Sequence, residues 1–197
     1  MKHHIGIIVG SLRKDSFNRR LGAALVKLAP KELTFRQIAI HDLPLYNQDD
    51  DNNPDPSVRR LKAEIAASDA ILFVTPEYNR SIPGVLKNAL DHASRPYGQS
   101  VWAGKPAGIV GISVGASGTA MAQQHLRTIL AYLDMPTVGQ PEIFLKMSDD
   151  LFAPDNSIAT EGTRQLLQKW LERFTAWVEQ HKADTAEPMR QAARPGA

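Results

Sequence analysis

The sequence predicts an α/β domain built on a parallel sheet that helices cover on both faces. Apolar runs of strand length alternate with amphipathic stretches of helical period from about residue 4 to residue 181. Two of the runs, 70–75 and 107–113, are apolar throughout, which is typical of parallel strands buried on both faces. A length of 197 residues and an apolar content of 43% suit one domain with a full core.

Ten elements are expected in strict alternation of strand and helix. The first helix carries Leu21, Leu25 and Leu28 on one face. The second strand alternates apolar and polar residues, which indicates a place near the edge of the sheet. Pro83 stands in the favoured first turn of the third helix. The expected strands are 4–9, 33–40, 70–75, 107–113 and 138–145. The expected helices are 17–29, 57–67, 83–93, 118–134 and 159–181.

The domain is expected to cover residues 1–182 and to be followed by a disordered tail, 183–197, which mixes Ala, Glu, Pro, Arg and Gly. The last helix has an apolar stripe, so its aromatic residues are interpreted as core or interface residues rather than as a stacking platform. These aromatic residues are Trp170, Phe174 and Trp177.

Composition excludes several classes of function. The net charge is +2 and no block of Lys and Arg occurs, so a nucleic-acid partner is not expected. No apolar run approaches the length of a membrane span. The absence of cysteine excludes thiolate metal sites and thiol nucleophiles and fits a reducing compartment. Because the first residues are too polar for a signal peptide, a cytoplasmic location is expected.

No metal site is expected. Asp49, Asp50, Asp51 and Asp55 lie in a long acidic loop, 41–56, without the spacing of a calcium loop, and are interpreted as solvated. The histidines show no ligand spacing either. Those considered are His41, His92, His125 and His181.

A loop rich in hydroxyls follows the first strand and precedes the first helix. A helix N-terminus with outward backbone N–H groups favours an anion, and Ser11, Arg13, Ser16 and Asn18 can complete its hydrogen bonds. The loop has neither the Walker pattern nor the Gly-x-Gly-x-x-Gly of dinucleotide sites. A terminal monophosphate, such as that of FMN, fits best. The alternative is an ordinary turn with helix-capping residues.

The loop after the third strand, 75–84, combines two prolines with a glycine, so its backbone N–H groups can be held rigidly. An isoalloxazine ring needs such donors along one edge and a flat surface against one face. Tyr78 can supply the surface and the amides of 77–79 the hydrogen bonds. The alternative is a rigid turn in which Tyr78 packs and Ser81 caps a helix.

A third loop, 113–120, follows the fourth strand. Gly115 and Gly118 allow a close backbone approach to a planar ligand, although any tight turn could use them. Loops that follow parallel strands meet at the carboxyl edge of the sheet, where ligands of such folds bind. The three loops are therefore expected to converge on one site.

At these loops the sequence resembles the NADPH-dependent FMN reductase family, most of all its branch of bacterial quinone and chromate reductases. The resemblance covers about residues 4–145, and the last helix fits more loosely. The segment from Pro76 to Asp91 is the most specific part. The other matching segments are Gly10–Arg13, Ser16–Asn18, Ala93–Pro96, Gly104–Pro106, and Ser113 with Gly115 and Gly118.

The resemblance implies a flavodoxin-like fold of strand order 2-1-3-4-5, non-covalent FMN, NADPH or NADH as donor, and a homodimer or homotetramer. Arg80 and Ser81 would stand at the mouth, and Asp91, Arg95 and Tyr97 would contact a neighbouring subunit. The phosphate and ribityl end would be held by Ser11, Arg13, Ser16, Phe17 and Asn18. The flavin ring would be held by Pro76, Glu77, Tyr78 and Asn79, with Ser113 and Gly115 at its other edge.

The function expected from these features is ping-pong hydride transfer from NAD(P)H through flavin N5 to a quinone or a similar acceptor, such as chromate or an azo compound. The cofactor carries this chemistry, so no catalytic side chain is required. A non-catalytic flavodoxin-like electron carrier is the alternative, against which the sequence pI near 8.9 speaks. Two further alternatives are another enzyme on the same loops, such as an azoreductase, and a flavin-free regulatory module.

Overall fold

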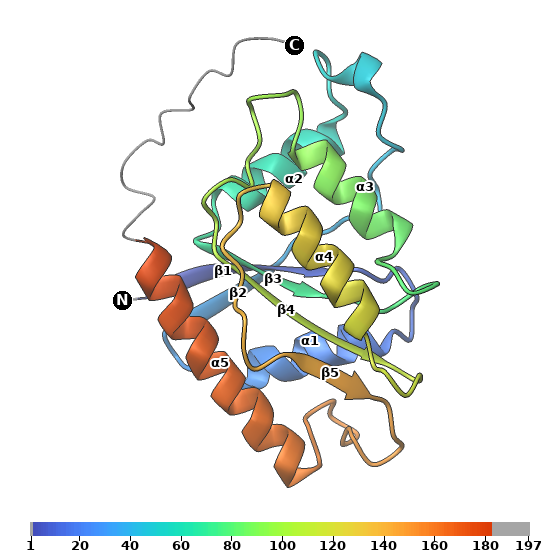
Figure 1. The fold of residues 1–197 in the computed structure, drawn as a ribbon, viewed down its shortest axis with the longest axis vertical. Coiled ribbons are helices and arrows are strands. Elements are labelled where there is room, and N and C mark those ends of the chain that lie inside the picture. Colours follow the sequence, from blue (N-terminus) through green and yellow to red (C-terminus); the bar gives the residue numbers. More distant parts are fainter. Residues whose placement is uncertain (1, 183–197) are drawn as a thin grey trace.

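The computed structural model describes residues 2–182, and its five strands form one parallel sheet in the order β2-β1-β3-β4-β5 (Figure 1). That order confirms the expected one. The strands are β1 (His3–Val9), β2 (Leu33–Gln37), β3 (Ala70–Val74), β4 (Ala107–Ser113) and β5 (Ile143–Lys146). The helices are α1 (Phe17–Leu28), α2 (Pro56–Ala66), α3 (Gly84–Ala93), α4 (Ala120–Tyr132) and α5 (Glu161–Lys182), with a short 3-10 turn, η1 (Gln48–Asp50).

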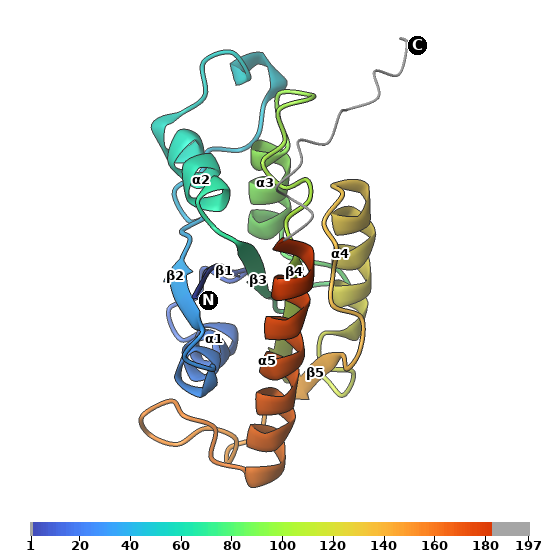
Figure 2. The same cartoon turned by 90° about the vertical axis from the view of Figure 1, so that its left-hand side faces the viewer.

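Helices cover both faces of the sheet, with α1 and α5 on one face and α2, α3 and α4 on the other (Figures 1 and 2). Each face has its own apolar cluster. Trp170 and Phe174 of α5 are fully buried and stack with ring centroids 5.3 Å apart. They pack against Gly108, where a Cβ would lie 2.7 Å from the Trp170 ring. The prediction that these two aromatic residues belong to the core is confirmed.

The central strands end level with one another, and this positions the loops that follow them. Val9 of β1 pairs with Val74 of β3, which pairs in turn with Val110 of β4. The Gly10 N–H continues the ladder to Val74 O at 2.9 Å, and the Thr75 N–H donates to Val110 O at 3.0 Å. The chain therefore leaves β1 and β3 at neighbouring points of the carboxyl edge.

The expected fifth strand, 138–145, is wrong over most of its length, because β5 contains only Ile143–Lys146. The Val138 N–H donates to Ala107 O at 2.9 Å, and the Val138 carbonyl accepts from Arg127 Nη1 at 2.7 Å. Pro141 has no N–H for a sheet ladder, and Gly139 precedes it, so pairing resumes only beyond the proline. The second strand, β2, ends at Gln37, although the Ile38 N–H still donates to Ile7 O.

The remaining boundaries differ from the expected ones by at most two residues, and the third helix begins one residue later than expected. Pro83 is not its first helical residue but occupies the N-cap position, with φ −60° and ψ 145°. The tail 183–197, which the sequence predicts to be disordered, lies outside the described residues.

Candidate functional site

The loop after β1 presents a run of backbone N–H groups toward the carboxyl edge. Within residues 2–182, the N–H groups of 11–16 donate no hydrogen bond to a protein acceptor. Ser16 is the N-cap of α1, and its hydroxyl accepts from the Arg19 N–H at 3.4 Å. Ser11 and Ser16 are both buried. Free amides beside a helix N-terminus are an arrangement that can hold an anion.

Asn18, in the first turn of α1, ties this loop to β4. Its Nδ2 donates to Ile112 O at 2.8 Å, and its Oδ1 accepts from the Ile112 N–H at 3.1 Å. Strand β3 ends at Val74, so no residue of β3 pairs with Ile112. The side-chain amide of Asn18 forms the two hydrogen bonds that a backbone peptide of β3 would otherwise form. The Asn18 amide thus positions the loop through both its nitrogen and its oxygen, and its predicted bond to an anion stays a prediction.

Arg13 lies against its own loop. Its Nε donates to Asp15 O at 3.0 Å, Nη2 donates to the same oxygen, and its guanidinium carbon lies 4.8 Å from the centroid of the Phe17 ring. The side chain is exposed, and it keeps a positive charge beside the free amides. A negatively charged group held by those amides would meet this charge as well.

The loop after β3 contains a two-residue hairpin that the sequence did not reveal. The backbones of Tyr78 and Ser81 exchange two hydrogen bonds, of 3.0 and 2.9 Å, and the residues between them, Asn79 and Arg80, have φ values of 51° and 61°. Positive φ at both central positions belongs to a type I′ turn, the tight turn that matches the twist of paired strands. Asn79 was the one signal, because asparagine tolerates this conformation.

Two side chains hold the hairpin against α4. Glu77 Oε2 accepts from the N–H groups of Met121, at 2.9 Å, and Ala122, at 3.0 Å. This caps the first turn of α4, whose own N-cap residue, Thr119, makes no side-chain capping bond. One turn further on, the Ser81 hydroxyl and Nδ1 of His125 are hydrogen-bonded at 2.9 Å. Ser81 does not cap α3, so the alternative interpretation of this residue is wrong.

The loop after β4 is closed by Ser113. Its hydroxyl donates to Gly118 O at 2.5 Å and accepts from the Gly115 N–H at 3.2 Å. Gly118 has φ +60°, which favours glycine. Beneath this loop, a Cβ on Gly111 would lie 2.4 Å from Thr75 O and 2.2 Å from Oγ1 of Thr119. The second and third loops are therefore packed without space between them.

The three loops also share an exposed apolar character, which favours a flat ligand. Each loop has an apolar side chain with more than a third of its surface exposed to solvent, as does Met121 in α4, and Tyr78 is 50% exposed. At the hairpin the Tyr78 N–H is used by Ser81 O. The N–H groups of Glu77 and Asn79 have no acceptor in the described part of the chain. The exposed apolar residues are Leu12, Tyr78, Val114 and Met121. The edge thus offers donors for an anion at one end and donors beside an apolar surface at the other, which fits FMN.

Other features considered in the sequence lie elsewhere. Over residues 2–182, no group of three or more His, Cys, Asp or Glu side chains could hold a metal ion. No helix in that range is long and apolar enough to span a membrane. Of the four aspartates in the acidic loop, Asp51 is half-buried and the others are exposed. His92 is buried and donates from Nε2 to Pro44 O at 2.8 Å.

Comparison with known proteins identifies the family. The model of the NADPH-dependent FMN reductase family matches residues 3–150. A 2-hydroxy-1,4-benzoquinone reductase from a Burkholderia species is 52% identical over 174 residues, which cover 88% of this chain and 95% of the relative. A quinone reductase from Pseudomonas putida is 47% identical over 182 residues, covering 92% and 97%.

A solved structure agrees with these sequence matches. FerB, a flavoenzyme NAD(P)H:(acceptor) oxidoreductase from Paracoccus denitrificans, is 44% identical and superposes with a TM-score of 0.88, over 91% of this chain and 98% of that one. The resemblance seen in the three loops and the flavodoxin-like fold are both confirmed. The chain belongs to the NADPH-dependent FMN reductase family, as an NAD(P)H-dependent oxidoreductase that uses FMN.

Proposed function

We propose that this protein is an NAD(P)H:quinone oxidoreductase that works by a ping-pong mechanism. FMN, when bound, supplies an N5 atom that takes a hydride from the nicotinamide and passes it to the acceptor in two separate half-reactions. The observation that carries the proposal is the carboxyl edge itself, where free amides at one end and an exposed apolar surface at the other suit a bound flavin. The names of the similar reductases favour a quinone as acceptor.

Each loop has a distinct role in this proposal. The amides of 11–16, with Ser11, Arg13, Ser16 and the neighbouring Phe17, hold the phosphate and ribityl end, and Asn18 fixes them relative to β4. The segment 76–79 faces the ring. Its backbone donors are the N–H groups of Glu77 and Asn79, while the Glu77 carboxylate positions the hairpin by capping α4. Residues proposed around the ring are Pro76, Glu77, Tyr78, Asn79, Ser81, Ser113 and Gly115.

Donors near the pyrimidine edge of the ring favour the reduced cofactor because negative charge develops there. Tyr78, half exposed on the rigid hairpin, lines the place where donor and acceptor enter in turn. The exposed Arg80 beside it suits anionic substrates. One entrance used successively by two substrates is the structural basis of the ping-pong proposal.

The finer features of the proposal concern acceptors, assembly and location. Chromate and azo compounds are proposed as secondary acceptors, because the exposed apolar surface at the carboxyl edge restricts the shape of an acceptor little. A homodimer or homotetramer is proposed, supported by Leu45 and Tyr97, whose side chains are 87% and 84% exposed in the single chain. A cytoplasmic location is proposed because the NAD(P)H donor is an intracellular metabolite.

Initial rates test the mechanism. With 2-hydroxy-1,4-benzoquinone and NADPH varied together, double-reciprocal plots should give parallel lines, and anaerobic mixing with NADPH alone should bleach the flavin. Protein stripped of FMN is the control and should be inactive until FMN is restored. Intersecting lines would exclude the ping-pong order. A retained flavin whose absorption NADPH leaves unchanged would favour the electron carrier instead.

A further inference from the structure

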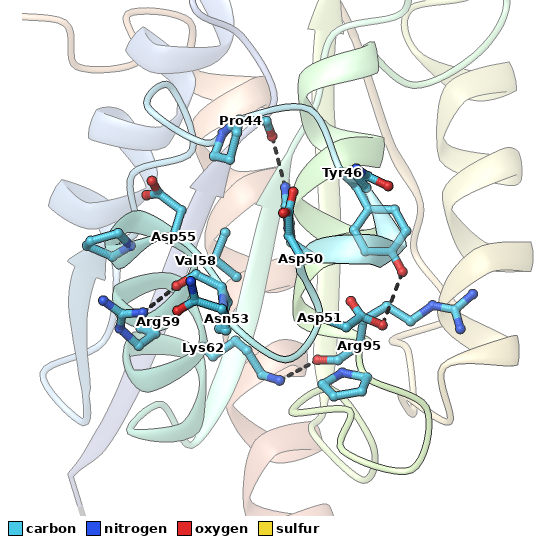
Figure 3. Close-up of a pocket in the computed structure, with 15 residues that line it drawn as sticks. Pro44, Tyr46, Asp50, Asp51, Asn53, Asp55, Val58, Arg59, Lys62 and Arg95 are labelled. Atoms are coloured by element: carbon cyan, nitrogen blue, oxygen red, sulfur yellow. Dashed lines mark hydrogen bonds between the residues drawn. The ribbon is translucent and has the colours of Figure 1, made fainter.

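A cavity beside Tyr46 opens between the 41–56 loop, the first turns of α2 and the C-terminal end of α3, and has a volume of about 390 Å³ (Figure 3). Its charges act on one another, Asp51 on Lys62 and Asp55 on Arg59. The charged side chains that line it are three carboxylates and three cations, those of Asp50, Asp51, Asp55, Arg59, Lys62 and Arg95. The cavity therefore favours neither an anionic nor a cationic ligand, and a group that serves the proposed reaction lies at the hairpin instead.

The proposed reaction needs a proton as well as a hydride. A quinone becomes a hydroquinone when it gains both, and FMN, when bound, supplies only the hydride with its electron pair. A side chain that donates a proton while the hydride moves accelerates such a step by about a hundredfold or more. Histidine suits this role, because its charge changes within the physiological pH range.

The Ser81 hydroxyl and Nδ1 of His125 share a hydrogen bond of 2.9 Å. Ser81 lies in the hairpin opposite Tyr78, to which its backbone is joined by two hydrogen bonds, and the half-exposed Tyr78 ring lines the proposed entrance. His125 is exposed on α4, so its ring can exchange protons with water. The pair thus connects the solvent to the place where the quinone is proposed to enter.

The hydrogen bond between Ser81 and His125 can run in either direction, and this allows a proton to be passed on. When the ring is neutral and carries its proton on Nε2, Nδ1 accepts from the Ser81 hydroxyl. When the ring is charged, its Nδ1–H donates to Ser81 Oγ, and the hydroxyl proton is left free to bond to another acceptor. The N–H and the C=O of Ser81 are both used by Tyr78, so the hydroxyl is the group of Ser81 that remains for a substrate.

The hairpin loop and α4, the two segments that meet at this bond, also carry charged residues. Glu77 caps the first turn of α4, one turn before His125. Arg80 is exposed in the hairpin, and Arg127 of α4 is paired with Glu142 at 3.2 Å. A substitution of His125 leaves all of these residues in place, so a changed pH dependence can be assigned to the ring itself.

We propose that Ser81 and His125 form a proton relay to the quinone, and this proposal rests on the proposed reductase function. As the hydride reaches the quinone, the Ser81 O–H bond breaks and its proton forms an O–H bond with a quinone oxygen. The proton on Nδ1 of His125 restores the Ser81 hydroxyl, and the neutral ring regains a proton from water. The quinone is reduced by two electrons and the flavin is oxidised by two, so electrons and protons balance. Ser81 meets the substrate, and His125 acts through Ser81.

The test follows the second half-reaction of the FMN-loaded enzyme. Enzyme reduced with an equal amount of NADPH in the absence of oxygen is mixed with 1,4-benzoquinone, which has no ionisable group, and the return of the flavin absorption is timed. In Ser81→Ala and in His125→Gln the rate should fall roughly tenfold or more at about pH 6. Flavin reduction by NADPH should change less than about threefold, because it takes no proton from this pair. The double variant should be no slower than the single variants, because the two residues act as one unit.

The pH dependence separates a relay from a purely structural role. Because the charged ring is the donor, the wild-type rate should fall as the pH rises and the ring loses its proton. The His125→Gln rate should lack this fall, so the two rates should converge at about pH 9.

His4→Gln is the matched control. His4 is also exposed, and its Nδ1 also bonds to a hydroxyl, that of Thr34 at 3.0 Å. It lies near the start of β1, at the opposite edge of the sheet from the hairpin. This variant should leave both half-reactions and their pH dependence unaltered.

Nitrogen NMR of the holoenzyme gives a readout that does not depend on activity. The neutral His125 ring, assigned by comparison with His125→Gln, should carry its proton on Nε2 in the wild type and lose that preference in Ser81→Ala. A neutral ring protonated on Nδ1, an unchanged rate of flavin reoxidation in the variants, or equal losses in both half-reactions would overturn the relay. If NADPH does not bleach the wild-type flavin, the reductase function has failed and the relay fails with it, whereas failure of the relay alone leaves the bleaching intact.

Discussion

The loop after β1 and the hairpin after β3 reach the same edge of the sheet but are held there in different ways. Asn18 anchors the first loop inside the sheet, where its amide is 2% exposed and pairs with the backbone of β4. The hairpin is anchored on the outside, by the carboxylate of Glu77 on the first turn of α4 and by a bond between Ser81 and His125. One anchor is buried and the other is exposed to water.

Because the two anchors differ, we expect the first loop to determine whether FMN binds and the hairpin to determine how the bound FMN reacts. A buried anchor cannot be removed without leaving unpaired groups in the core, so the phosphate end should depend on the stability of the whole fold. An exposed anchor is replaced by water at small cost, so changes at the hairpin should alter how the flavin reacts rather than whether the protein folds. Four substitutions test the comparison, and the first should have the strongest effect on stability.

Asn18→Ala should have the largest effect. It leaves the N–H and C=O of Ile112 buried without partners, which should lower the free energy of unfolding by about 4 kcal/mol and prevent retention of FMN. Urea unfolding and the flavin content after desalting measure the two effects. Asn88→Ala is the matched control, because that amide also makes two backbone bonds but is partly exposed. Equal losses in both variants would contradict the role of burial.

Gly111→Ala should come next, at about 3 kcal/mol, because the new Cβ meets Thr75 O, a backbone atom that cannot rotate away. Gly111 lies beneath both the second and the third loop, so flavin affinity should fall together with stability. Gly84→Ala, where nothing lies within 4 Å of the new Cβ, should leave stability unchanged or slightly raised. A stable Gly111→Ala variant with normal flavin content would contradict this prediction, because it would show that the second and third loops can move apart without loss of stability or of FMN binding.

Glu77→Ala should cost about 1 kcal/mol, the usual value of a helix cap. It should weaken FMN binding less than roughly tenfold while the rate of flavin reduction by NADPH falls, because the hairpin is no longer fixed. Glu77→Gln keeps an acceptor oxygen and should recover most of both properties. Fluorescence titration of FMN and rapid mixing under anaerobic conditions separate the two effects. If Glu77→Ala failed to fold, Glu77 would be as important for stability as the buried Asn18, and the comparison would be contradicted.

Ser81→Ala should have the smallest effect, below about 0.5 kcal/mol, because its bond to His125 is exposed to water. FMN affinity should change less than about twofold, and any change should appear in the rate of reduction. His125→Ala should match it. A large loss of FMN affinity in either variant would mean that the bond between Ser81 and His125 determines binding as the buried anchor does.

Local pattern was sufficient for most of the fold. The fully apolar β3 and the stripe of α5 reflect burial directly, so periodicity located both, and alternation of elements implied the parallel sheet. The local pattern failed at β5. Apolar residues on both sides of Pro141 predicted a longer strand than the backbone can form.

The site was predicted as a set of loops but not as a set of contacts. Asn18 meets Ile112 across 94 positions of the sequence, and Glu77 meets α4 across 44 and 45. Such pairings depend on the strand order, which a local motif does not contain. The type I′ turn at Asn79 and Arg80 was missed because arginine is an unusual residue at positive φ. The cavity beside Tyr46 was missed because its walls come from separate segments.

The flavin spectrum of the purified chain shows whether the carboxyl edge of the sheet holds FMN. After incubation with FMN and desalting, we expect a retained yellow spectrum at one flavin per chain, which NADPH bleaches in the absence of oxygen. The Asn18→Ala variant should emerge colourless from the same column, and Gly84→Ala should retain its flavin fully. A wild-type chain that leaves the column without flavin would contradict the assignment of the carboxyl edge as an FMN site.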